Sequence, residues 1–149
     1  MYPVILAIHN IVRWVVLILG VIVVIRGLLG WFGKREWSTM DRKLGVYFTS
    51  SIDVQLLVGL VLYIFLSPLT TSAFRDFGSV MSNDGLRFFA VEHAVIMLLA
   101  VVFAHLGGVY SKRVSASKDK YKMAAIWYGL ALIAVLLGMP WMRPFLPGL

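Results

Sequence analysis

Four long apolar stretches divide the chain, and short polar segments separate them. They cover Val4–Leu28, Gly45–Leu66, Leu86–Gly107 and Met123–Met139. Most are close to the about 20 residues that cross about 30 Å of hydrocarbon at about 1.5 Å per residue. Backbone polar groups in hydrocarbon must bond within their own segment, so each stretch should be a helix. The pattern predicts an all-α membrane protein, a single transmembrane domain over 1–149 folded as an up-down four-helix bundle.

The composition supports this class. Hydrophobic residues make up 60% of the chain and charged residues 14%, and the mean hydropathy is +0.88. A soluble domain needs more polar residues on its surface, and a disordered chain has far fewer apolar ones. The chain has no cysteine. Disulfides, Cys-ligated zinc, iron–sulfur clusters and covalently attached c-type haem are therefore excluded.

Basic residues gather on one side of the predicted bundle. The connections after the first and third stretches, with Arg26, hold ten of the 14: Arg26, Lys34, Arg35, Arg42, Lys43, Lys112, Arg113, Lys118, Lys120 and Lys122. The positive-inside rule then predicts cytoplasmic basic loops, with both termini outside. The positive-inside rule accounts for the net charge of +7 without nucleic-acid binding. We therefore expect membrane partners and no nucleic acid.

Polar residues inside the apolar stretches are the candidates for function, since a charge at mid-membrane costs about 2.5–3.5 kcal/mol or more. They are His9 and Arg13 in the first stretch, Asp53 and Gln55 in the second, and Glu92, His93 and His105 in the third.

His9 and His93 are expected at a similar depth. Both stretches run inward from outside, and the two residues differ by roughly 3 Å in depth at 1.5 Å per residue. Two neutral imidazoles at one level, one on each side of a flat macrocycle, are the axial ligands that a b-type haem requires. His105 lies about 18 Å deeper by the same arithmetic. The spacing therefore predicts haem iron between His9 and His93, with Arg87 near outward-pointing propionates.

Two other interpretations of this pair stay open. The histidines are equally suited to ordinary hydrogen bonds between helices, without any cofactor. A bare metal ion with Glu92 as a third ligand is less favoured, because Glu92 points about 100° away from His93 on a helix.

Arg13 lies one turn from His9, on nearly the same helix face. A charge at this depth needs a partner, and Glu92 and Asp53 bracket its level. We favour Glu92, with Arg13 supporting the structure more than contacting a haem propionate.

Asp53 marks a possible second polar site in the cytoplasmic half, which also contains His105. The residue either fastens its helix to a neighbour or exchanges protons with a quinone. The first role is favoured, because the sequence identifies no aromatic-lined pocket and no basic partner around Asp53, and a quinone is only weakly supported.

Three segments resemble the small four-helix bacterial membrane proteins labelled cytochrome b: HNIVRW at 9–14, FTSSIDVQLLVGLVLYIFLSP at 48–68 and RFFAVEHAVIMLLAVVFAHLG at 87–107. The resemblance extends from His9 to about Gly108 and weakens over the fourth stretch. It implies haem b and a bacterial inner membrane, without assigning the ligands.

The expected function is a cytochrome b-like electron carrier in a respiratory or photosynthetic complex. A haem with two axial histidines has no open position for substrate, so we expect no enzymatic activity from the chain alone. The rival interpretation is a haem-free accessory subunit whose polar residues tie helices together.

Overall fold

The computed structural model describes residues 1–141 and 143, and this part of the chain is helical between its turns. Its elements are α1 (Tyr2–Phe32), α2 (Thr39–Val61), η1 (Leu62–Leu66), α3 (Pro68–Arg75), α4 (Phe77–Met81), α5 (Asp84–Arg87), η2 (Phe88–Glu92), α6 (His93–Arg113) and α7 (Ser117–Gly138). Four continuous runs are long and apolar enough to cross a membrane: Tyr2–Phe32, Thr39–Leu66, Asp84–Arg113 and Ser117–Gly138. The predicted four-helix architecture is confirmed, and these runs extend beyond most of the predicted boundaries.

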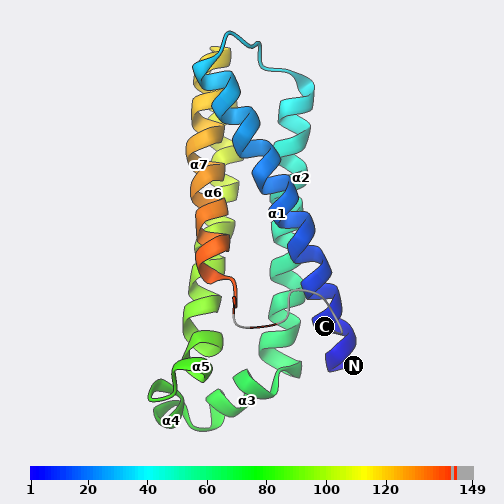
Figure 1. The fold of residues 1–149 in the computed structure, drawn as a ribbon, viewed down its shortest axis with the longest axis vertical. Coiled ribbons are helices and arrows are strands. Elements are labelled where there is room, and N and C mark those ends of the chain that lie inside the picture. Colours follow the sequence, from blue (N-terminus) through cyan, green and yellow to red (C-terminus); the bar gives the residue numbers. More distant parts are fainter. Residues whose placement is uncertain (142, 144–149) are drawn as a thin grey trace.

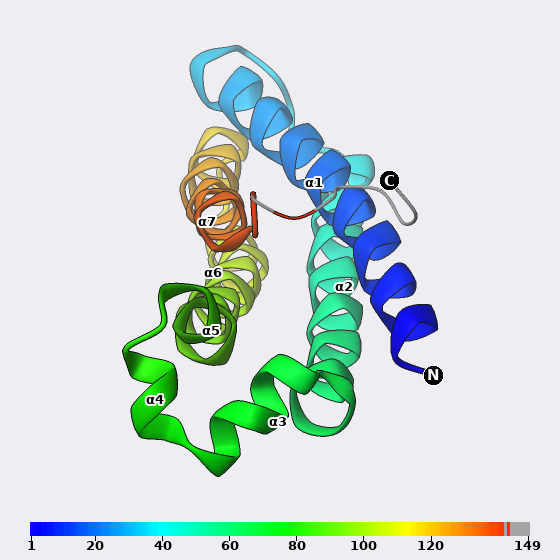
Figure 2. The ribbon, with the colours of Figure 1, turned by 60° about the horizontal axis from the view of Figure 1, so that its bottom comes forward.

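The four long helices pack as a ring in the order α1, α2, α6, α7, and each one contacts the next. α1 is strongly tilted, so that it lies against α7 near residue 27 and against α2 near residue 9 (Figures 1 and 2). We call the end with connections 33–38 and 114–116 the basic end. The opposite end contains the N-terminus and the short helices α3 and α4.

Local signals start several of the helices. Ser38 caps α2 reciprocally: its hydroxyl accepts the backbone N–H of Asp41, and the Asp41 carboxylate accepts the backbone N–H of Ser38. Pro68 opens α3, where its missing N–H costs no helical bond. The side chain of Asn83 accepts from the backbone N–H of Leu86 and starts α5.

Glycines allow the close approach of α1 to α7. A Cβ at Gly27 would lie 3.0 Å from the backbone of Ala125, and a Cβ at Gly30 would overlap the ring of Tyr121. Tyr128 of α7 likewise lies against Gly45 of α2 and Gly107 of α6. The tyrosine rings of α7 therefore fill the space beside glycines of α1, α2 and α6.

Gly30→Ala is expected to destabilise the bundle, because its methyl group and the buried Tyr121 ring cannot share the same space. Overpacking of this kind costs about 1–3 kcal/mol. Gly129→Ala is the matched control, since a Cβ there meets nothing within 4 Å. Thermal unfolding in detergent should separate the two variants, and equal unfolding temperatures would contradict this packing.

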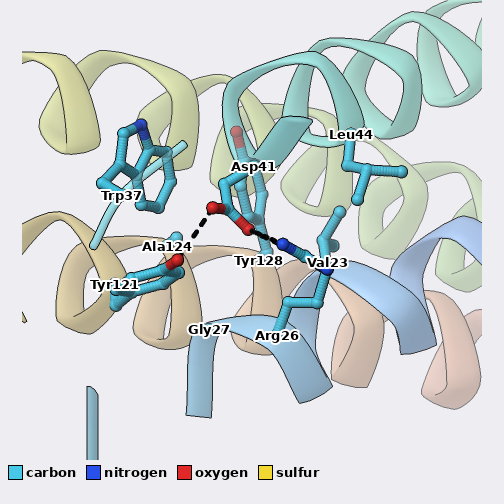
Figure 3. Close-up of a pocket in the computed structure, with 9 residues that line it drawn as sticks. All are labelled: Val23, Arg26, Gly27, Trp37, Asp41, Leu44, Tyr121, Ala124 and Tyr128. Atoms are coloured by element: carbon cyan, nitrogen blue, oxygen red, sulfur yellow. Dashed lines mark hydrogen bonds and ion pairs between the residues drawn. The ribbon is translucent and has the colours of Figure 1, made fainter. Parts of the chain in front are cut away.

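A buried carboxylate joins three helices at the basic end. Asp41 of α2 accepts from Arg26 of α1 and from the hydroxyl of Tyr121 of α7, each at 2.7 Å (Figure 3). Ser38 adds its backbone N–H at 2.9 Å and its hydroxyl at 2.6 Å. The donors around Asp41 thus come from α1, from α7 and from the residue that caps α2, and the cluster joins these three helices.

The two π-helical segments lie at the opposite end and are bonded to each other. Each contains a backbone bond to a residue five positions earlier, from Ser67 to Leu62 and from His93 to Phe88. The hydroxyl of Tyr63 in η1 donates to the carbonyl of Ala90 in η2 at 2.5 Å. π segments insert an extra residue into a turn and are frequent at functional sites. Here, η2 ends immediately before His93.

Candidate functional site

His9 and His93 lie close together in the half of the bundle that contains the N-terminus. Their ring centres are 6.4 Å apart and their planes lie at 65°. His9 belongs to α1 and His93 begins α6, two helices that lie across the ring from each other. The two histidines that the sequence places at a similar depth are therefore adjacent in space.

His93 is oriented by the end of α7. Its Nδ1 lies 2.7 Å from the carbonyl oxygen of Gly138. A carbonyl only accepts hydrogen bonds, so Nδ1 carries the hydrogen and Nε2 keeps its lone pair. This is the arrangement by which proteins commonly orient a metal-binding histidine. A Cβ at Gly138 would lie 2.9 Å from Ile96, so the close approach of this carbonyl to α6 depends on glycine.

His9 is held by α2. The side-chain amide of Gln55 donates to the carbonyl of His9 at 3.0 Å and lies 3.2 Å from its Nε2. Gly59, one turn farther along α2, leaves space for the imidazole, since a Cβ there would lie 3.3 Å from Cε1 of His9. The tilt of α1 makes these contacts possible, because it brings the part of α1 near residue 9 against α2 (Figures 1 and 2).

Two buried polar atoms at this place lack a hydrogen-bond partner among the residues that the structure describes. They are Nδ1 of His9 and Oε1 of Gln55. A buried polar atom without a partner costs about 1–3 kcal/mol. Proteins therefore rarely leave such atoms together unless a water molecule, ion or ligand meets them.

Aromatic side chains border His93. The rings of Phe88 and Phe89 in η2 have centres 6.0 and 6.3 Å from its imidazole. The guanidinium of Arg143 lies over the Phe89 ring at 5.1 Å. The histidine pair thus has an apolar wall on the η2 side, with a cation behind it.

The arginines of the predicted site have different surroundings. Arg13 is buried, 6% exposed, and its guanidinium lies 6.0 Å from the ring centre of Trp14. Arg87 binds Glu92 at 2.8 Å and Asp84 at 3.1 Å. Glu92, the partner that we preferred for Arg13, is therefore bound to Arg87. This pair ties the two ends of η2 together.

The second predicted site forms a separate cluster. Nε2 of His105 lies 2.9 Å from Oδ1 of Asp53, across the interface between α6 and α2. The sequence placed these residues in one half of the membrane without predicting their contact. They line a cavity of about 360 Å³.

Three residues that shape the structure around these sites were not predicted from the sequence. Gln55 was recognised as polar but given no role, Gly138 offered no signal, and Asp41 was passed over within a basic connection. The Ser38–Asp41 spacing is a capping-box pattern that indicates a helix start, though not the bond to Arg26. The cavity beside Asp41 is only about 10 Å³ (Figure 3). It has room for about one water at most, so this small cavity is not a ligand site.

Within the described residues, no group of three or more His, Asp or Glu side chains is placed to hold a metal ion. The histidine pair offers two nitrogen ligands and no carboxylate. Comparison of the chain with family models, curated proteins and solved structures finds no match, so the geometry of the His9–His93 pair carries the functional conclusion.

Proposed function

We propose that this protein is a cytochrome b-like integral membrane subunit that carries electrons through a haem b held by His9 and His93. It works within a larger electron-transfer complex, and its redox partners are other membrane subunits. The observation that carries the proposal is the meeting of the two imidazoles inside the bundle, 6.4 Å apart.

This separation suits two axial ligands of one iron. With metal–nitrogen bonds of about 2 Å and about 1 Å from nitrogen to ring centre, imidazoles on opposite sides of a metal have centres about 6 Å apart. A haem brings four equatorial nitrogens of its own, so two protein ligands suffice. A bare ion would need more ligands than this pair provides.

The hydrogen bonds of the two histidines determine which nitrogen of each would bind the iron. His93 has its Nε2 lone pair available, because Gly138 fixes the hydrogen on Nδ1. His9 shares its Nε2 with the amide of Gln55. Binding iron through that atom replaces one hydrogen bond, while Gln55 keeps its bond to the His9 carbonyl.

The haem would supply one-electron transfer at this place. The chain's own residues hold and surround it. Phe88 and Phe89 keep water from the His93 side, and Arg13 and Arg87 are the basic residues that we propose for its propionates. With both His9 and His93 holding the iron, no open position would remain on it for a substrate.

The rival function is a haem-free accessory subunit. The bonds from Gln55 to His9 and from His93 to Gly138 favour it, because each already links two helices. Electron paramagnetic resonance of the ferric protein discriminates between the two. Two imidazole ligands give a low-spin signal. A protein with only a high-spin signal, or with none, would contradict the proposal.

The orientation that we propose has the basic end in the cytoplasm and both termini outside, on the strength of the positive-inside rule. Ser82 and Ser115 are exposed and lie at opposite ends of the bundle. Because the chain has no cysteine, Ser82→Cys and Ser115→Cys each introduce a single thiol. An impermeant thiol reagent should label intact cells that carry Ser82→Cys and leave Ser115→Cys unlabelled. The reverse pattern would overturn the orientation.

A further inference from the structure

A cavity of about 360 Å³, lined by several charged and hydroxyl-bearing residues, lies between α2 and α6 in the half of the bundle nearest the basic end. Thr49, Asp53 and His105 line its inner part, and Arg42, Lys112 and Lys120 line the part at the basic end. The cavity therefore extends along α2 from residue 42 to residue 53, about 16 Å at 1.5 Å per residue.

The inner part of this cavity reaches the middle of the membrane. Asp53 lies about 20 Å from either end of the 28-residue run Thr39–Leu66. It is 42% exposed, and its partner His105 is 54% exposed. Ionisable side chains at mid-membrane face the protein interior or a water-filled cavity, because contact with lipid is too costly. A pair that is half exposed at this depth needs water beside it.

The wall of the cavity is suited to water. Thr49, Ser50 and Ser111 are among the residues that line it. Lys120 of α7 donates to the carbonyl of Ser111 at 3.2 Å, which keeps an ammonium group at the basic end of the cavity. A cavity needs only about 10–15 Å³ of such space for one water, so this one has room for a continuous file.

We propose that this cavity is a water-filled crevice, open at the basic end, through which the Asp53–His105 pair exchanges protons with the aqueous phase on that side. The pair takes one proton from a hydronium ion, leaves a water molecule, and returns the proton by the same route. No electron moves, and no bond between heavier atoms forms or breaks. The inference is independent of the haem.

The groups that face this pair come from three helices. Asp41 and Arg42 of α2, Lys112 of α6, and Lys120 and Tyr128 of α7 line the same cavity. The carboxylate of Asp41 is already bonded to Arg26 and Tyr121. Asp53 is consequently the lining carboxylate that is left to stabilise a protonated His105.

The reactivity of introduced thiols tests whether water fills the cavity. Ser50→Cys and Thr49→Cys each place a thiol in the cavity, and Val54→Cys places one on the exposed apolar face of α2. Position 54 lies about 6 Å farther from the basic end than position 50. Thiols react as thiolates, which form in water. A charged methanethiosulfonate added at the basic end should modify the two cavity positions at least about tenfold faster than position 54.

Equal, slow modification of all three positions would overturn the crevice. The same measurement in vesicles of zwitterionic and of anionic lipid tests for a lipid headgroup. Slow modification of Ser50→Cys in the anionic vesicles alone would show that a headgroup fills the cavity, which also contradicts the proposal. Two cavity positions keep the test valid if one variant fails to fold.

Nitrogen-15 NMR of the full chain in bilayers tests the proton exchange. The chain has three histidines, and His105→Gln identifies the signals of His105. These signals should move when the bulk pH on the side of the basic end is changed. In Asp53→Asn, the response of these signals to the bulk pH should differ from that of the wild type, because the carboxylate 2.9 Å from the imidazole is gone. His105 signals that ignore the bulk pH would refute the proposal, whether or not the protein holds haem.

Discussion

Replacement of His93 by alanine is expected to abolish the low-spin haem spectrum, and His9→Ala should have the same effect. Each histidine would supply one of two axial ligands, and losing either leaves the iron with an open position. His105→Ala should leave the spectrum unchanged, since His105 lies in the Asp53 cluster. Absorption spectra of the three purified variants, compared at equal protein concentration, check this expectation.

His93→Gln separates ligation from folding. Its side-chain amide can still donate to the carbonyl of Gly138, as Nδ1 of His93 does, but an amide is not an axial ligand of haem. We expect this variant to fold as the wild type does and to lack the low-spin spectrum. A wild-type spectrum in both His93 variants would mean that the iron is held elsewhere.

Asp41→Ala should cause the largest loss of stability among single polar substitutions. It leaves Arg26 and the hydroxyl of Tyr121 without the carboxylate that each contacts at 2.7 Å. Breaking a buried ion pair by removing one partner costs about 3–5 kcal/mol. The free energy of unfolding in mixed detergent micelles should fall by about this amount.

Asp119→Ala is the matched control, because Asp119 is an exposed carboxylate in the first turn of α7. Its substitution should change stability by less than about 1 kcal/mol. Asp41→Asn should fall between the two, since an amide oxygen still accepts from Ser38 and Tyr121 but carries no charge for Arg26. If Asp41→Ala and Asp119→Ala had the same free energy of unfolding, the cluster would not be holding α1, α2 and α7 together.

The spans and the histidine pair could be predicted because they depend on properties that a sequence expresses directly. Hydropathy determines which segments enter a membrane, and rise per residue relates position to depth. His9 and His93 lie on helices that run in the same direction, so that this arithmetic needed no knowledge of how the helices pack.

The remaining contacts depend on tilt, rotation and local backbone geometry. The bond from Gln55 to His9 needs the tilt of α1, and the contact between Asp53 and His105 needs the rotation of α2 relative to α6. The π turn before His93 shifts the register by one residue, which no apolar pattern reveals. Hydropathy also gave no sign of α3 and α4, which are too short to cross a membrane.

The absorption spectrum of the wild-type protein tests the central claim most directly. The protein would be purified in a mild detergent from cells that make haem, and recorded before and after reduction with dithionite. We expect a Soret band and a sharp α band on reduction, with one haem per folded chain. A folded, monodisperse protein with no Soret absorbance, which also takes up no added haem, would contradict this claim.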